Sequence, residues 1–195
     1  MKIYLASKSP RRRELLSMMQ VEYELLLFDT PEIVAPNEPP EQYSRRVTQE
    51  KLTAGWEQLQ REKLPFYPVV CADTEVVLDN CILGKPQNPQ EAFQMIKNLA
   101  GRSHDVITSI GLKYFDYQKI VTNSTRVTFS DIPDEAIHHY LATDNYLDKS
   151  GSYGIQSYIG QFISRINGCF YSVMGLPLNS LRELLTEVQQ QVHIK

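Results

Sequence analysis

The chain has 195 residues, of which 42% are hydrophobic and 22% are charged, as in an ordinary globular protein with a sizeable core. Its 20 basic residues against 23 acidic ones give a net charge of −3, which excludes a general attraction to nucleic acid or to an anionic membrane surface. No apolar run approaches a membrane span, and the 3 cysteines form no C-x-x-C pair, which is typical of a reducing compartment. We therefore expect a single soluble domain, residues 1–195, in the cytoplasm.

The N-terminal segment combines a short strand with a helix that begins in an unusual way. Residues 3–6 are an apolar run typical of a buried strand. Ser9 and Pro10 suit the N-cap and the first helical position, and apolar residues at helical spacing follow. Residues 11–13 are all arginine, although cations oppose the partial positive charge of a helix N-terminus. This predicts a seat for an anion such as phosphate, lined by at most two of the arginines; a solvated basic helix end is the alternative.

A buried strand further along places a carboxylate at a position suited to ligands. The Pro-rich residues 31–40 predict a connecting loop, and residues 43–61 a helix. Residues 69–72 are typical of a buried parallel strand, so we place Asp73 at its carboxyl end, where ligands bind in open α/β sheets. A carboxylate there can hold a hard cation such as Mg²⁺. An ordinary turn residue is the alternative.

The next stretch predicts a hairpin that fixes a lysine. Asp79-Asn80 is typical of a tight turn between strands 75–78 and 81–83. Lys85 follows between a glycine and a proline, a fixed position for a point charge on phosphate, with a plain loop residue as the alternative.

The second half of the chain predicts further helices and hairpins. These are a helix from 88 to about 100, strands 104–114 and 119–129, a helix 133–142, a hairpin 162–173 turning at Asn167-Gly168, and a helix 179–190. Helices mixed with parallel-type and hairpin strands predict an α/β protein with a mixed, twisted sheet.

Other kinds of site have poor support in the sequence. The histidines have no zinc-ligand spacing with the cysteines, and no G-x-S-x-G elbow is present. The P-loop pattern is absent because Gly84-Lys85 is followed by proline, and the aromatic residues form no platform for single strands.

Five motifs together resemble the Maf-like nucleoside triphosphate pyrophosphatases. They are residues 5–16 (LASKSPRRRELL), 72–74 (ADT), 84–86 (GKP), 147–156 (LDKSGSYGIQ) and 175–177 (GLP). The resemblance runs from Ile3 to about Leu185 in the family's order and spacing. It implies a twisted mixed sheet with flanking helices, related to that of the inosine triphosphate pyrophosphatases, and two lobes around a cleft. It also implies a homodimer that cleaves nucleotides between the α- and β-phosphates with Mg²⁺ or Mn²⁺.

The resemblance assigns catalytic roles to four charged residues. Glu32 matches a metal-binding glutamate, and Asp73 matches the central carboxylate that serves as metal ligand or general base. Lys51 and Lys85 match two lysines that grip phosphate. From the residues alone, a solvated helix face is the alternative for Lys51.

The residues implied to bind substrate are Ser7, Arg11, Arg12, Thr74, Lys149 and Gln156. Among them, Arg11, Thr74 and Gln156 match the members that act on dTTP and UTP. An amide such as that of Gln156 could pair with the edge of uracil or thymine, whereas a surface turn residue is the alternative.

The chain departs from the family's pattern at several positions. Glu75 stands where an apolar residue is usual, Ser150 and Ser152 stand where alanines are, and Ser172 stands where asparagine is common. Residues 29–32 read Asp-Thr-Pro-Glu where Asp-x-Asp-Glu is frequent. None of these departures removes a group with an implied catalytic role.

We therefore expect a metal-assisted pyrophosphatase that converts dTTP and UTP to the monophosphate and pyrophosphate. One alternative is a broader house-cleaning pyrophosphatase for non-canonical nucleotides. Another is a non-catalytic nucleotide-sensing regulator of cell division that uses the same cleft.

Overall fold

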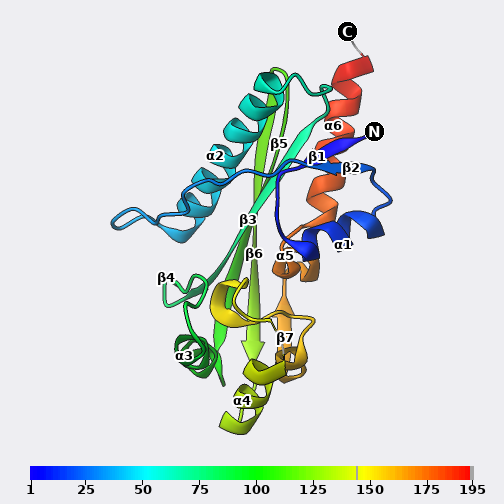
Figure 1. Cartoon of the computed structure of the whole chain (residues 1–195). Coiled ribbons are helices and arrows are strands. Elements are labelled where there is room, and N and C mark those ends of the chain that lie inside the picture. The colour runs from blue at the N-terminus through cyan, green and yellow to red at the C-terminus, as the bar shows by residue number, and fades with distance from the viewer. Residues whose placement is uncertain (144, 194–195) are drawn as a thin grey trace.

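One mixed sheet runs through the whole molecule (Figure 1), whose computed structural model describes residues 1–143 and 145–193. The strands follow the order β2-β1-β3-β5-β6-β7, and β4 pairs with β3 outside this path. β1 is parallel to β2 and β3, whereas the remaining pairs are antiparallel. The strands are β1 (Ile3–Leu5), β2 (Tyr23–Leu25), β3 (Val69–Leu78), β4 (Cys81–Ile82), β5 (Ser103–Tyr114), β6 (Tyr117–Phe129) and β7 (Ile163–Asn167).

Helices flank the sheet, which confirms the predicted α/β fold class. The α-helices among the described residues are α1 (Pro10–Met18), α2 (Pro40–Arg61), α3 (Pro89–Leu99), α4 (Asp134–Thr143), α5 (Phe170–Met174) and α6 (Leu178–His193). Two short 3₁₀ helices are η1 (Ser150–Ser152) and η2 (Tyr158–Phe162). In this part of the chain, none of the helices has the length and apolar character needed to cross a membrane.

Separate hydrophobic cores divide the molecule into two lobes. In one lobe, α1 and α6 pack on one face of the sheet and α2 packs on the other. In the other lobe, α3 and α4 pack against the continuation of β3, β5 and β6. Side chains alternate along β3, so Val70 and Ala72 face α1 and α6 while Val69 and Cys71 face α2. Asp73 shares the α2 face by the same alternation.

The prediction that a strand ends before Asp73 is wrong. β3 continues to Leu78 because residues 73–77 pair with β5, with Asp73 opposite Ser109. β1, however, pairs with β3 only at Val69 and Val70. Asp73 therefore lies where the parallel neighbour has ended and leaves β3 open on that side.

The predicted hairpin 162–173 is also wrong in its second half. β7 pairs with β6 as expected, but the segment after Gly168 forms the short helix α5. An apolar run of this length fits a buried strand or a helix equally well. Gly175 then ends α5 in a left-handed conformation, φ 106°. β2 had no counterpart in the sequence prediction.

Local chemistry confirms two other predicted features. Asn88 caps α3 by accepting a hydrogen bond of 2.8 Å from the amide of Glu91, whose carboxylate accepts one of 2.8 Å from the amide of Gln87. Asp79 and Asn80 turn the β3–β4 hairpin with positive φ angles of 51° and 63°.

α2 approaches the sheet closely because β5 has a glycine beneath it. A Cβ atom at Gly111 would lie 2.6 Å from Cδ1 of Leu52 and 3.0 Å from Cγ2 of Thr48. Leu52 and Thr48 are fully buried, so neither has free space to move into.

Gly111→Ala should therefore lower the free energy of unfolding by about 1–3 kcal/mol through overpacking. Urea denaturation followed by circular dichroism measures this change. Leu52→Ala should offset part of it, so that the double variant is destabilised by less than the sum of the single variants. Strictly additive effects would show that α2 does not rest on Gly111.

Candidate active site

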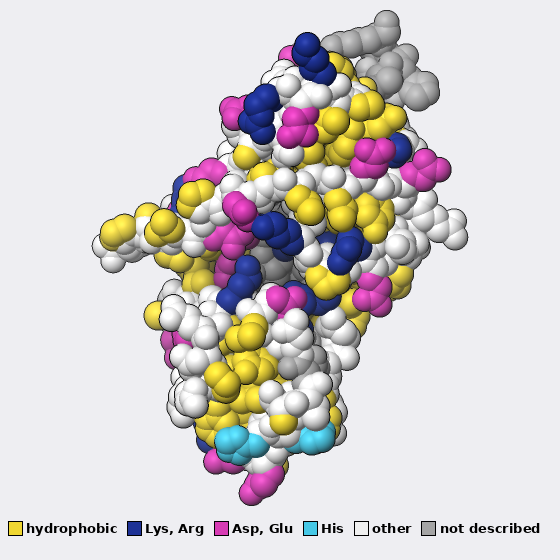
Figure 2. Space-filling view, viewed as in Figure 1, with side chains coloured by type: hydrophobic (Ala, Val, Ile, Leu, Met, Phe, Trp, Pro, Cys, Tyr) yellow, Lys and Arg dark blue, Asp and Glu magenta, His cyan; other side chains and the backbone are white. Residues whose placement is uncertain are grey.

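A cavity of about 420 Å³ opens between the two lobes, where Figure 2 shows basic and acidic side chains around a hollow. Every residue implied by the resemblance to act at the site lines it: Ser7, Arg11, Arg12, Glu32, Lys51, Asp73, Thr74, Lys85, Lys149 and Gln156. Segments far apart in the sequence therefore meet at one place. Arg13 is not among the lining residues, in agreement with the expectation that at most two of the arginines face a site.

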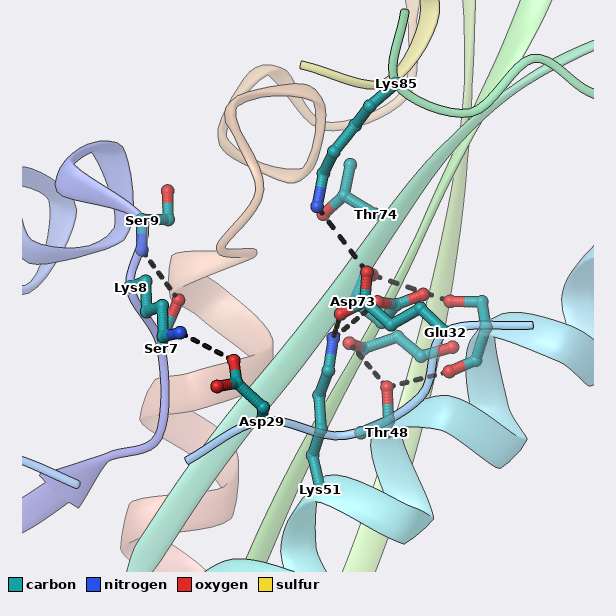
Figure 3. A network of polar contacts seen from close by, with 12 residues as sticks. Ser7, Lys8, Ser9, Asp29, Glu32, Thr48, Lys51, Asp73, Thr74 and Lys85 are labelled. Carbon is teal, nitrogen blue, oxygen red and sulfur yellow. Dashed lines mark hydrogen bonds and ion pairs between the residues drawn. The ribbon is translucent and has the colours of Figure 1, made fainter. Parts of the chain in front are cut away.

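Two lysines and two carboxylates form the centre of the cavity (Figure 3). Lys51 Nζ lies 2.8 Å from Asp73 Oδ1 and 2.6 Å from Glu32 Oε1. Lys85 Nζ lies 3.5 Å from Glu32 Oε2. α2 supplies Lys51, the loop before it supplies Glu32, and the loop after β4 supplies Lys85. The side chains of Asp73 and Lys51 are only 5% and 12% exposed, so each needs the other's charge.

The charged groups of this cluster stabilise one another's ionised forms. Burial alone would lower the pKa of Lys51, but Asp73 and Glu32 outweigh it and raise that pKa. Burial alone would raise the pKa of Glu32, but Lys51 and Lys85 outweigh it and lower that pKa. Glu32 and Lys51 are therefore both ionised at neutral pH.

Asp73 keeps one carboxylate oxygen free of the protein. Oδ2 is buried, and no donor from the described residues forms a hydrogen bond with it. Such an atom can accept a proton, a water or a cation. Within the described chain, no three His, Cys, Asp or Glu residues gather closely enough to hold a metal ion by themselves. The pair Asp73 and Glu32 nevertheless suits Mg²⁺, which usually takes one or two carboxylates and completes its shell with phosphate and water.

A half-buried arginine fixes the wall formed by the first helical turn. Arg12 donates from Nε to the carbonyl of Gly175 (2.8 Å), from Nη1 to Ser7 Oγ (3.1 Å) and from Nη2 to Thr74 Oγ1 (3.2 Å). Burial lowers the pKa of Arg12, yet a guanidinium stays charged in proteins. Ser9 occupies the N-cap position, but its side chain makes no capping bond; its amide instead donates to Ser7 Oγ (3.1 Å). The arrangement forms a rigid cationic wall.

Asp148 links this wall to the loop of residues 148–156. Its Oδ2 accepts from Arg11 Nη1 at 2.9 Å, and its Oδ1 accepts from Lys149 Nζ at 2.9 Å. Sequence reasoning did not assign Asp148 to the site. Its position beside Lys149 in the fourth motif was the available signal.

Glu75 is a further residue that sequence reasoning left outside the site. It lines the cavity and is 8% exposed, and Ser150 Oγ donates to its Oε2 at 2.9 Å while accepting from the amide of Val76. Burial, together with the negative charge of Asp73, raises the pKa of Glu75 to about 8. The two departures at positions 75 and 150 are thus hydrogen-bonded partners.

The loop that carries Gln156 is tightly packed at its base. A Cβ atom at Gly154 would lie 3.2 Å from Lys149 Cε and 3.3 Å from Gln156 Oε1. The hydroxyl of the buried Tyr153 lies 2.6 Å from His104 Nε2. Gln156 itself is exposed at the cavity, where its amide can meet a ligand.

Several known proteins resemble this chain along nearly its whole length. The family model described as "Maf-like protein" matches residues 2–188. A dTTP/UTP pyrophosphatase of Dechloromonas aromatica is 37% identical over 193 residues, 95% of this chain and 96% of the relative. Relatives with the same name in Nitrosomonas europaea and Albidiferax ferrireducens are 40% and 41% identical, over 95% and 94% of this chain and 93% and 94% of their own lengths.

Among solved structures, the Ham1 protein of Staphylococcus aureus matches with a TM-score of 0.44 and 13% identity, over 67% of this chain and 73% of its own. That likeness is too weak to carry an argument. The family match instead covers nearly the full length, and the relatives are similar from end to end. On these grounds the chain belongs to the Maf-like protein family.

Proposed function

We propose that this chain hydrolyses dTTP and UTP to the nucleoside monophosphate and pyrophosphate, assisted by Mg²⁺ or Mn²⁺. The observation that carries the proposal is the contact of Lys51 with both Asp73 and Glu32 in a cavity lined by further cations. The three relatives named dTTP/UTP pyrophosphatase support the choice of substrates.

Glu32 and Asp73 are the residues that would hold the metal. A bound divalent cation supplies a lowered pKa for the attacking water and offsets charge on the phosphate. Asp73 Oδ2, buried and without a hydrogen-bond donor among the described residues, is the atom available to hold the cation and to orient its water. The remaining oxygen of Asp73 stays fixed by Lys51.

The cations of the cavity would stabilise the departing pyrophosphate. Phosphoryl transfer depends mostly on positioning and charge neutralisation, for which fixed cations in a shielded site are effective. Arg12 is held by three protein acceptors and needs no reorganisation. Lys85, 57% exposed at the mouth, is free to exchange Glu32 for a phosphate.

Base choice would depend on Arg11, Thr74 and Gln156. The Gln156 amide can donate and accept at once, which suits the N3–H and carbonyl groups of uracil and thymine. Thr74 Oγ1 accepts from Thr108 Oγ1 at 3.0 Å as well as from Arg12, so its position is set.

We also propose a homodimer located in the cytoplasm. Phe66 and Phe115, 48% and 46% exposed and 5.1 Å apart between ring centroids, provide an apolar surface suited to a partner. Free cysteines suit a reducing compartment. The house-cleaning and sensor alternatives use the same cavity and differ from the main proposal in substrate range and in turnover.

Incubation with UTP or dTTP and Mg²⁺ or Mn²⁺ should release the monophosphate and pyrophosphate, and EDTA should stop the reaction. Chromatography of the nucleotides with coupled pyrophosphate detection measures this. Release of orthophosphate and a diphosphate would contradict the proposed bond cleavage. Binding without turnover would favour the sensor, and faster turnover of modified nucleotides would favour the house-cleaning enzyme.

Asp73→Asn should keep the fold, because the side chain is isosteric and Lys51 retains Glu32 as its counter-ion, and should lower kcat by about a hundredfold or more. Steady-state kinetics with a thermal unfolding check measures both effects. Asp105→Asn is the matched control, since Asp105 also lies in a strand but pairs with Arg126 at the surface (2.9 Å). Equal activity of the two variants would assign the catalytic role elsewhere.

Gln156→Ala should erode the preference for UTP and dTTP over CTP and GTP, because a base-reading amide discriminates through its own hydrogen bonds. The ratio of kcat/KM across the four nucleotides measures this, and metal dependence should persist. Gln161→Ala, which removes an exposed amide bonded to the carbonyl of Tyr158, should leave the ratio unchanged. An unchanged ratio in Gln156→Ala would make this residue an ordinary turn residue.

A further inference from the structure

The loop that carries Glu32 is fastened to α2 by an ion pair outside the cavity. Arg46 Nε lies 2.7 Å from Glu38 Oε1, and Arg46 Nη2 lies 2.7 Å from Glu38 Oε2. Two parallel bonds of this kind fix orientation as well as distance. Neither residue lines the cavity, and the proposed reaction uses neither.

The same two side chains also hold the backbone of the loop. Arg46 Nη2 donates to the carbonyl of Ile33 at 2.9 Å, one residue beyond Glu32. Glu38 Oε2 accepts from the amide of Ala35 at 3.0 Å, and the amide of Glu38 donates to the carbonyl of Ala35 at 3.1 Å. Arg46 and Glu38, together called the Arg46–Glu38 clamp, therefore hold the backbone immediately next to Glu32.

Apolar packing contributes little to the placement of this part of the loop. Residues 26–39 have no helix or strand, and Ile33 and Val34 are 73% and 46% exposed. The Glu32 side chain bonds to Lys51 and Lys85, which are themselves groups that a phosphate would attract. When Lys85 turns to a ligand, Glu32 loses one of these bonds, and the Arg46–Glu38 clamp continues to hold the backbone beside it.

We propose that Arg46 and Glu38 are positioning residues that hold Glu32 ready for a divalent cation. This inference rests on the proposed function, in which Glu32 and Asp73 hold the metal. Residues that orient a ligand of a metal typically change its affinity about 10–100-fold when they are replaced. The bonds from Arg46 also keep the pKa of Glu38 at about 2, so the clamp stays charged throughout the neutral pH range.

Binding of Mn²⁺ in the absence of nucleotide tests the inference without relying on activity. Electron paramagnetic resonance of free Mn²⁺ gives the dissociation constant for the wild type, Glu38→Gln and Glu50→Gln. Glu50 is the matched control because it accepts from the same guanidinium (Nη1, 2.9 Å) and carries the same charge, but lies on α2 and not on the loop. Glu38→Gln should weaken Mn²⁺ binding about tenfold, and Glu50→Gln should change it less than about twofold.

Kinetics separate positioning from catalysis. In Glu38→Gln, the Mn²⁺ concentration that half-activates UTP hydrolysis should rise about tenfold, while kcat at saturating Mn²⁺ stays near that of the wild type. Amide hydrogen exchange of residues 31–38 should become faster in this variant only. If Glu38→Gln fails to fold, Arg46→Lys keeps the charge, loses the fork and should give the same shift.

Equal Mn²⁺ affinity in the wild type and in the folded clamp variants would overturn the inference. So would a wild type that binds no Mn²⁺ without nucleotide, or an equal loss of affinity in Glu50→Gln, which would reveal a general effect of charge. Hydrolysis of UTP and its inhibition by EDTA are measured separately, so failure of the clamp leaves the proposed reaction testable on its own.

Discussion

The ion pair between Asp73 and Lys51 is the constraint on which the rest of the structure depends. A carboxylate almost wholly removed from water is stable only beside a cation, and Lys51 can reach it only if α2 lies close to the sheet. Gly111 allows this close approach, because it has no side chain and α2 packs directly over its backbone. A glycine in one strand thus determines where a charged group of a neighbouring helix meets another strand.

Alternate residues of β3 line two different parts of the cavity. Asp73 and Glu75 face α2 and the lysines, whereas Thr74 faces the arginine wall of α1. Consecutive residues therefore reach different walls of the cavity without competing for space. β1 ends beside this point, so β3 has no parallel neighbour there.

Much of this arrangement could be predicted from sequence, for identifiable reasons. Periodicity and capping chemistry predicted α2 and α3, and five ordered motifs contain most of the predicted residues that meet in the cavity. Glu32 and Lys51 lie outside these motifs and were assigned through the family resemblance alone. The continuation of β3 through Asp73 was missed because pairing with a distant strand, not local composition, decides where a strand ends. Glu75 and the Arg46–Glu38 clamp depend on contacts across the chain or on a loop's path, which single-residue patterns do not contain. Asp148 lies in the fourth motif, but its pairing with Arg11 is a contact between distant segments.

The uninterrupted strands between the lobes limit how the molecule can move. β5 and β6 are paired from Ser103–Thr128 at one end to Tyr114–Tyr117 at the other. β3 pairs with β5 from Val69 to Val77, in the region between the two lobes. A hinge between the lobes would have to bend this continuous ladder, which opposes closure of the two lobes as rigid bodies. Adjustment around a nucleotide is left to exposed side chains that line the cavity, such as those of Lys85 and Gln156. The continuous strands between the lobes are stiff, and conformational adjustment is confined to side chains at the edge of the cavity.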